Sequence, residues 1–166
     1  MKAVVLLSAL LSLPVLAAEP TLYGRYEYLQ LAELGKTLKA KMDTGAYTAS
    51  LSARDIQRFK REGEEWVRFR LAADGADDTL YEHRLARISK IKNRADEGDD
   101  PAAADVSKRP VIDLQLCLGH ELRTVEVNLA DRSSFNYPLL IGAKALREFN
   151  AAIDPAKRFT AGKPAC

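Results

Sequence analysis

Two short motifs, about a hundred residues apart, constrain the fold of this chain more than any other feature. Asp43-Thr44-Gly45 ends the alternating run 38–42 (LKAKM), and the run 138–142 (PLLIG) comes much later. A Thr-Gly turn after a strand lifts an aspartate out of the sheet, and glycine after an apolar pair can pack closely behind such a turn. Asp-Thr-Gly alone is a common turn. With strand-like sequence between them, the two motifs together predict a β domain that presents one carboxylate.

The first eighteen residues are typical of a secretory signal peptide. Lys2 gives a basic start, the run 3–16 is mostly apolar, and small residues allow cleavage after Ala17 or Ala18. The apolar run is too short for a comfortable membrane span. An N-terminal core helix is the alternative, and Pro14 together with the abrupt polar switch argues against it. We therefore expect an exported protein of the periplasm, without stable membrane insertion.

The remaining residues, 19–166, are expected to form a single domain, because about 148 residues can enclose one core but not two. After removal of Lys2, 24 basic residues face 23 acidic ones, and the basic residues are scattered. Nucleic acids and anionic membranes select dense positive charge, so we expect neither as a partner.

Cys117 and Cys166 both lie in the exported part of the chain. An even pair of cysteines in an oxidising compartment predicts one disulfide. The alternative is two unrelated thiols, one in a strand and one near the C-terminus.

Short alternating runs predict a mainly β domain. A helix is expected over 142–149, and a second helix or turn over 52–60, opened by Ser52. The polar run 90–108 has no periodicity and predicts a mobile loop. Many short strands with one or two short helices indicate a barrel or a sandwich. The expected strands are 23–31, 37–42, 47–51, 66–71, 79–85, 109–118, 121–129, 137–141 and 151–153.

Several segments resemble a bacterial retropepsin-like aspartic peptidase family, and together they reach from residue 23 to residue 154. The resemblance implies a retropepsin-like acid-protease barrel with one half-site per chain. It implies Asp43 as the catalytic residue, with peptide or protein substrates; members of the family are tied to trimming glutamate-rich peptides. The segments are KAKMDTGAYTASLSARDI, EWVRF, RPVIDLQL, VEVNLADRSSFNYPLLIGAKAL and IDP. The other implied roles are support of the active-site turn by Thr44, Gly45 and Ala46, and packing behind it by Ile141 and Gly142.

That family is often labelled an ATP-dependent zinc protease, and the sequence does not support the label. The chain has neither a Gly-rich Lys-Ser/Thr loop for phosphates nor a His-Glu-x-x-His helix. Its two histidines, His83 and His120, are far apart, and its cysteines are not closely spaced. Surface roles are favoured for both histidines, and we expect no metal and no cofactor.

An aspartic mechanism needs two carboxylates that share one proton across a water molecule. The sequence contains one Asp-Thr-Gly, so the second carboxylate must come from another copy. A homodimer is therefore expected, in which Asp43 faces its mate across a two-fold axis. The resemblance implies that Thr44 hydrogen-bonds across this dimer and that residues 66–108 hold a mobile cover over the site.

Three positions depart from the family pattern and leave a second function class open. The family commonly has a basic residue at Tyr47, a histidine near Ser52 and an arginine at Ala143. An aspartate in such a turn can also do no more than cap its own backbone. The alternative to a peptidase is a non-catalytic peptide-binding or regulatory module that retains the fold.

Overall fold

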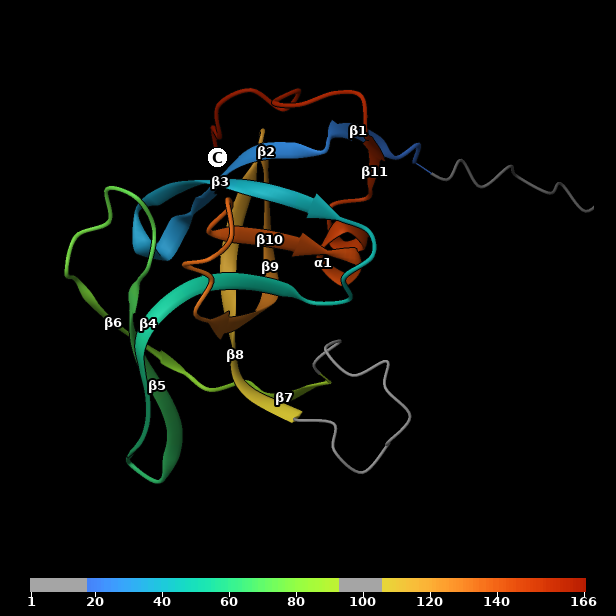
Figure 1. Ribbon diagram of the computed structural model, residues 1–166. Helices are drawn as coiled ribbons and strands as arrows, with labels where there is room; N and C mark the ends of the chain where they lie inside the picture. Colours follow the sequence, from blue (N-terminus) through green and yellow to red (C-terminus); the bar gives the residue numbers. More distant parts are fainter. Residues whose placement is uncertain (1–17, 93–105) are drawn as a thin grey trace, which may run out of the picture.

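Most of the described chain forms β-strands (Figure 1), because apolar side chains recur at every second residue and can be buried on one face. The computed structural model describes residues 18–92 and 106–166. In β9 (Glu121–Ala130), Val125, Val127 and Leu129 alternate toward the interior and are almost completely buried. The other strands are β1 (Thr21–Gly24), β2 (Tyr26–Leu31), β3 (Lys36–Asp43), β4 (Ala49–Arg61), β5 (Glu64–Leu71), β6 (Leu80–Arg84), β7 (Arg87–Lys92), β8 (Val106–Leu118), β10 (Leu139–Gly142) and β11 (Ala151–Asp154). The described helices are the short 3₁₀ helix η1 (Ala32–Leu34) and α1 (Ala143–Glu148).

Six of these strands close into a barrel. Their order is β10-β3-β2-β8-β9-β4, and β4 pairs again with β10 to complete the ring. Closure removes the free sheet edges whose backbone groups would otherwise lack partners. The mainly β barrel expected from the sequence is confirmed. Its core includes Leu29, Leu51, Leu116, Leu129, Leu139 and Ile141.

The remaining strands lie outside the ring. β5 and β6 extend the sheet beyond β4, β7 pairs with the first part of β8, and β1 forms a separate parallel pair with β11. The predicted hairpins β5–β6 and β8–β9 are confirmed. Neither helix in the described residues has the length and apolarity that a membrane crossing needs.

The strand β4 corrects one expectation, because residues 52–60 are neither a helix nor a turn. They continue the strand that starts at Ala49, and their backbone groups pair with β5. A register shift between Arg54 and Gln57, with Asp55 at a φ of 54°, identifies a β-bulge. The bulge interrupts the alternation of side chains between the two faces of the strand. The polar residues therefore cluster in the sequence as they would on a helix face, although the backbone is extended.

Two other boundaries also differ from the expected ones. The expected strand 23–31 is two strands, since the chain bends between β1 and β2. The expected loop 90–108 is strand at both ends, because β7 reaches Lys92 and β8 starts at Val106. The rest of that expected loop, 93–105, lies outside the described residues.

The C-terminal tail is attached to the barrel by a disulfide, by a buried carboxylate and by backbone hydrogen bonds, such as that from the Ala165 N–H to the Gly119 carbonyl oxygen. Cys117 on β8 and Cys166 form a disulfide with their Cα atoms 6.0 Å apart, which confirms the predicted bridge. A second attachment is the completely buried carboxylate of Glu27. It accepts hydrogen bonds from the backbone N–H groups of Gly24, Thr160 and Ala161 and from the Thr160 hydroxyl.

Candidate active site

Asp43 ends β3 and begins a turn that places its carboxylate at the surface of the barrel. The N–H of Gly45 donates to Asp43 Oδ1 over 3.1 Å, and the N–H of Ala46 donates to the Asp43 carbonyl oxygen over 3.3 Å. Thr44 and Gly45 are exposed. The Asp43 side chain is 23% exposed. The carboxylate is therefore held in one orientation and is still accessible to water or a ligand.

Lys41 stabilises the ionised form of this carboxylate. Its Nζ lies 2.8 Å from Asp43 Oδ2. The Lys41 hydrogen bond, against the opposing effect of partial burial, holds the pKa of Asp43 below its ordinary value. Asp43 is thus an anion at neutral pH. This pair was not predicted from the sequence, although residues two apart on a strand lie on the same face.

Strand β10 supports the turn from behind. It runs parallel to β3, with Gly142 opposite Asp43 and Ile141 opposite Met42. A Cβ on Gly142 would lie 2.6 Å from the carbonyl oxygen of Thr48, so a larger residue cannot occupy this position without moving the backbone. β3 and β10 are therefore neighbours, as the sequence predicted. The functional roles of Ile141 and Gly142 stay predictions.

The start of α1 continues this support. The N–H of Ala143 donates to the Ala46 carbonyl oxygen over 2.7 Å, and the N–H of Lys144 donates to the Tyr47 carbonyl oxygen over 2.9 Å. Two carbonyl groups of the turn are thereby satisfied by backbone donors rather than by water.

Asn128 on β9 supports the far end of the turn and was not identified from the sequence. Its amide Nδ2 donates to Thr48 Oγ1 over 3.1 Å and to the Ala49 carbonyl oxygen over 2.8 Å, and its Oδ1 accepts from the Ser50 hydroxyl. Asn128 and Ser50 are both buried. The available signal was a single amide in the otherwise apolar end of a strand, because a buried amide must be hydrogen-bonded.

A cavity of about 330 Å³ opens beside Asp43. The rings of Tyr26 and Tyr137 stack with their centroids 4.4 Å apart and contribute to its wall. Arg132 shares the cavity with Asp43, so a cation and an anion line the same space. The other lining residues are Lys41, Phe135, Asn136 and Leu140.

A second cavity, of about 440 Å³, lies between the turn and the β7–β8 hairpin. Tyr47 and Thr48 line it from the turn, and Ser89, Lys90 and Arg109 line it from the hairpin. This arrangement brings part of the expected cover next to the turn. The cover itself stays a prediction, since residues 93–105 in its later half lie outside the described ranges.

The three positions that depart from the family pattern all lie next to the site. Tyr47 is 64% exposed, with the Arg147 guanidinium 5.7 Å from its ring centroid. Ser52 is buried, and its hydroxyl accepts a hydrogen bond from the backbone N–H of Arg132. Ala143 directly follows Gly142. The structure therefore places these departures where they can alter binding at the site.

Comparison with protein families gives one match that covers most of the chain. The family is described as RimB-like, "Retropepsin-like aspartic endopeptidase RimB", and its model matches residues 22–164. This range includes the Asp43 turn and all of β10.

Curated relatives and a solved structure extend this likeness. Proteins of Shewanella halifaxensis (strain HAW-EB4) and Desulfotalea psychrophila (strain LSv54 / DSM 12343) are 33% and 32% identical, each over 84% of this chain. Both are named "Probable alpha-L-glutamate ligase", and this chain spans 30% and 29% of their lengths. A crystal structure of a protein of unknown function from Legionella pneumophila subsp. pneumophila str. Philadelphia 1 is 37% identical. Its TM-score is 0.68, and the match covers 84% of this chain and 97% of that one.

Proposed function

The chain belongs to the RimB-like family of retropepsin-like aspartic endopeptidases, and we propose that it is an aspartic endopeptidase of the periplasm. It hydrolyses peptide or peptide-like amide bonds through an aspartate dyad that homodimerisation completes. The observation that carries this proposal is the Asp43 turn. Its carboxylate is accessible, and the packing of Gly142 against Thr48 leaves the turn little freedom to move.

The dyad follows from the chemistry of amide hydrolysis. One carboxylate accepts a proton from the attacking water while the other, protonated, hydrogen-bonds the carbonyl oxygen of the scissile bond. The sequence has a single Asp-Thr-Gly, at 43–45. The second carboxylate is the same aspartate of a second copy, related by a two-fold axis. Two such carboxylates repel at close range, so the pair retains one proton.

The names of the curated relatives support glutamate-containing peptides as substrates. Both are named as ligases of α-L-glutamate, and a segment similar to this chain makes up about 30% of each relative. A peptidase for glutamyl amide bonds would act on peptides that contain the same amino acid. We therefore propose α-linked glutamyl peptides as the first substrates to test.

The test is hydrolysis by purified protein of residues 19–166, with products identified by mass spectrometry. Asp43→Asn should lower the rate by about 10²–10⁴-fold and leave the circular dichroism spectrum unchanged, because it removes only the proton-accepting oxygen. Asp74→Asn is the matched control, since Asp74 is an exposed aspartate in a neighbouring cavity. An active Asp43→Asn protein would contradict the proposal.

The dimer requirement is tested by dilution. Specific activity should fall as the protein dissociates, and sedimentation at the same concentrations should show monomer replacing dimer. Full activity in a purely monomeric sample would exclude a dyad shared between two copies.

The second candidate is a peptide-binding module without catalysis, and the Lys41 contact favours it. An ammonium 2.8 Å from Asp43 Oδ2 keeps the carboxylate ionised, whereas a dyad needs a shared proton. Tight peptide binding without cleavage between about pH 4 and about pH 8 would select this candidate, because that range brackets the titration of a dyad.

A further inference from the structure

Arg132 is a buried cation beside the candidate active site. The residue is 8% exposed, and its Nε atom is buried without a hydrogen-bond partner among the residues that the structure describes. Its guanidinium carbon lies 4.4 Å from the ring centroid of Phe135, and its backbone N–H donates to the Ser52 hydroxyl. A buried charge is costly unless it is paired and hydrogen-bonded. The side chain therefore has unused capacity for an anionic ligand.

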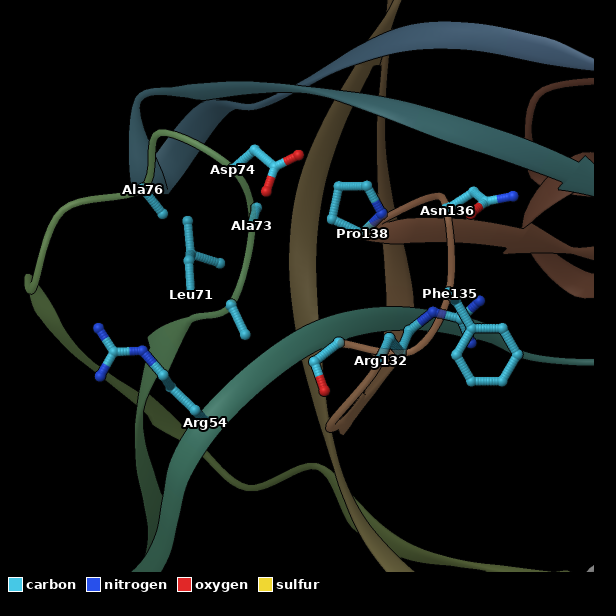
Figure 2. A pocket seen from close by; sticks show the side chains of 11 residues that line it. Arg54, Leu71, Ala73, Asp74, Ala76, Arg132, Phe135, Asn136 and Pro138 are labelled. Atoms are coloured by element: carbon cyan, nitrogen blue, oxygen red, sulfur yellow. The ribbon is translucent and has the colours of Figure 1, made fainter.

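The charged end of Arg132 faces the site. Arg132 lines the cavity that holds Asp43, the cavity between Tyr47 and the β7–β8 hairpin, and a third cavity of about 310 Å³ next to Leu71. Figure 2 shows that third cavity. There the guanidinium nitrogens of Arg132 lie beside Phe135, on the side away from Leu71. The side-chain stem thus lines the third cavity, while the guanidinium points away from it.

The chemistry of the guanidinium selects a carboxylate. Asp43 is the acidic group in the same cavity, but its two carboxylate oxygens are already bound by Lys41 and by the Gly45 N–H. Burial and the nearby Arg109 lower the pKa of Arg132, whereas Asp43 raises it. Arginine nevertheless remains protonated in proteins. Its planar fork of N–H donors matches the two oxygens of a carboxylate better than it matches a neutral amide.

We propose that Arg132 binds a carboxylate of the ligand and is the residue that makes the site specific for acidic peptides. The identity of the ligand as a peptide rests on the proposed function, but the carboxylate contact does not require hydrolysis. The carboxylate can belong to an acidic side chain or to a peptide C-terminus, and both present the same pair of oxygens.

Binding to the Asp43→Asn protein separates recognition from cleavage. Three fluorescent peptides of one length are compared by anisotropy: one with internal glutamate and an amidated end, one with glutamine in its place, and one neutral peptide with a free C-terminus. The glutamate or the free-end peptide should bind about 10- to 100-fold more tightly than the amidated glutamine peptide, as expected for a charged hydrogen bond. Whichever of the glutamate peptide and the free-end peptide binds more tightly identifies the source of the carboxylate. Equal affinity for all three would overturn the proposal.

Substitution of Arg132 assigns the effect to this side chain. Arg132→Gln in the same background should bring the affinity ratio close to one, and Arg132→Lys should keep part of it, because the charge remains but the fork is lost. Arg54→Gln is the matched control, since Arg54 lines the third cavity but is paired with Asp55 and Asp78. A purely structural Arg132 would lower thermal stability in Arg132→Gln without changing the ratio, which would also overturn the proposal.

Failure of this inference can be told apart from failure of the proposed function. If wild-type protein cleaves peptides without regard to their charge, the endopeptidase stands and the role of Arg132 is wrong. If it cleaves none of the peptides, yet binds the acidic peptide in an Arg132-dependent way, the role of Arg132 stands and the endopeptidase is wrong.

Discussion

Gly142 and Asp43 lie opposite each other in the parallel ladder of β10 and β3, although about a hundred residues separate them in the chain. The turn that follows Asp43 leaves no room for a side chain at Gly142, where a Cβ would meet the backbone of Thr48 and Ala46. The position of the carboxylate thus depends on a glycine that is remote in sequence.

Gly142→Ala should destabilise the protein by about 3 kcal/mol, because overpacking against backbone forces the chain to move. Urea denaturation measures the free energy of unfolding. Gly45→Ala is the matched control: a Cβ there would meet only Asp43 Oδ1, at an ordinary 3.4 Å, so its change should stay within about 1 kcal/mol. Equal stability of the two variants would contradict the packing argument.

Lys41→Met should move the acid limb of the pH–rate profile to higher pH. The Lys41 hydrogen bond is the main cause of the lowered pKa of Asp43, so its loss lets that pKa rise. The profile of kcat/KM against pH measures the effect. Lys39→Met removes a charge two residues away on the same strand and should leave the limb in place. A profile unchanged by Lys41→Met would show that Lys41 does not control the ionisation of Asp43.

Glu126 should contribute to stability at neutral pH and lose that contribution in acid. Hydrogen bonds from Arg87, the larger cause, and from Lys144 hold the pKa of Glu126 at about 2, below its ordinary 4.5. Because the folded-state pKa is depressed, the contribution is complete above about pH 4.5 and disappears as the pH falls toward about 2. These ion pairs are partly exposed, so Glu126 is expected to contribute about 1 kcal/mol to the free energy of unfolding.

Urea denaturation of wild type and Glu126→Gln across this pH range tests the effect. The stability gap between the two proteins should close as the pH falls. Glu148→Gln, an exposed glutamate on the neighbouring α1, should show no such convergence. A gap that is constant with pH would rule out the ion pairs as its cause.

Reduction of the Cys117–Cys166 disulfide should lower the thermal midpoint. The bridge closes a loop of 49 residues, and the chain-entropy model gives it about 4 kcal/mol. Calorimetry with and without reductant measures the change. The double variant Cys117→Ser/Cys166→Ser should resemble reduced wild type and should not respond to reductant. Identical midpoints for oxidised and reduced wild type would show that the noncovalent contacts of the tail, those with Glu27 among them, hold it without the bridge.

The sequence predicted the parts of the fold that depend on local pattern and on the two motifs. Alternation identified the β8–β9 hairpin, and the Asp43 and 138–142 motifs anticipated that β3 and β10 are neighbours. The course of β4 was not predicted, because its bulge at Arg54–Gln57 resets the alternation that such a prediction reads.

The surroundings of Asp43 were harder to predict than the turn itself. Asn128 and Arg132 reach the site through the register of β9 against β4, which pairs residues about eighty positions apart. Arg132 is a common residue in a polar segment, and Asn128 differs from its neighbours only as an amide in the otherwise apolar end of a strand. Their importance arises from burial, and burial depends on the closed barrel rather than on neighbouring residues.

The hydrogen bonds around the Asp43 turn also have a consequence for the order of folding. Its supports Asn128, Gly142, Ala143 and Lys144 all belong to the last third of the chain, so they are synthesised long after Asp43. Until that part has docked, the turn lacks the groups that fix it, and pairing over such a distance is a slow step in folding. An unfinished chain would carry the aspartate without a formed site. Rapid hydrogen exchange at 44–48 in a chain truncated before residue 128 would show this dependence directly.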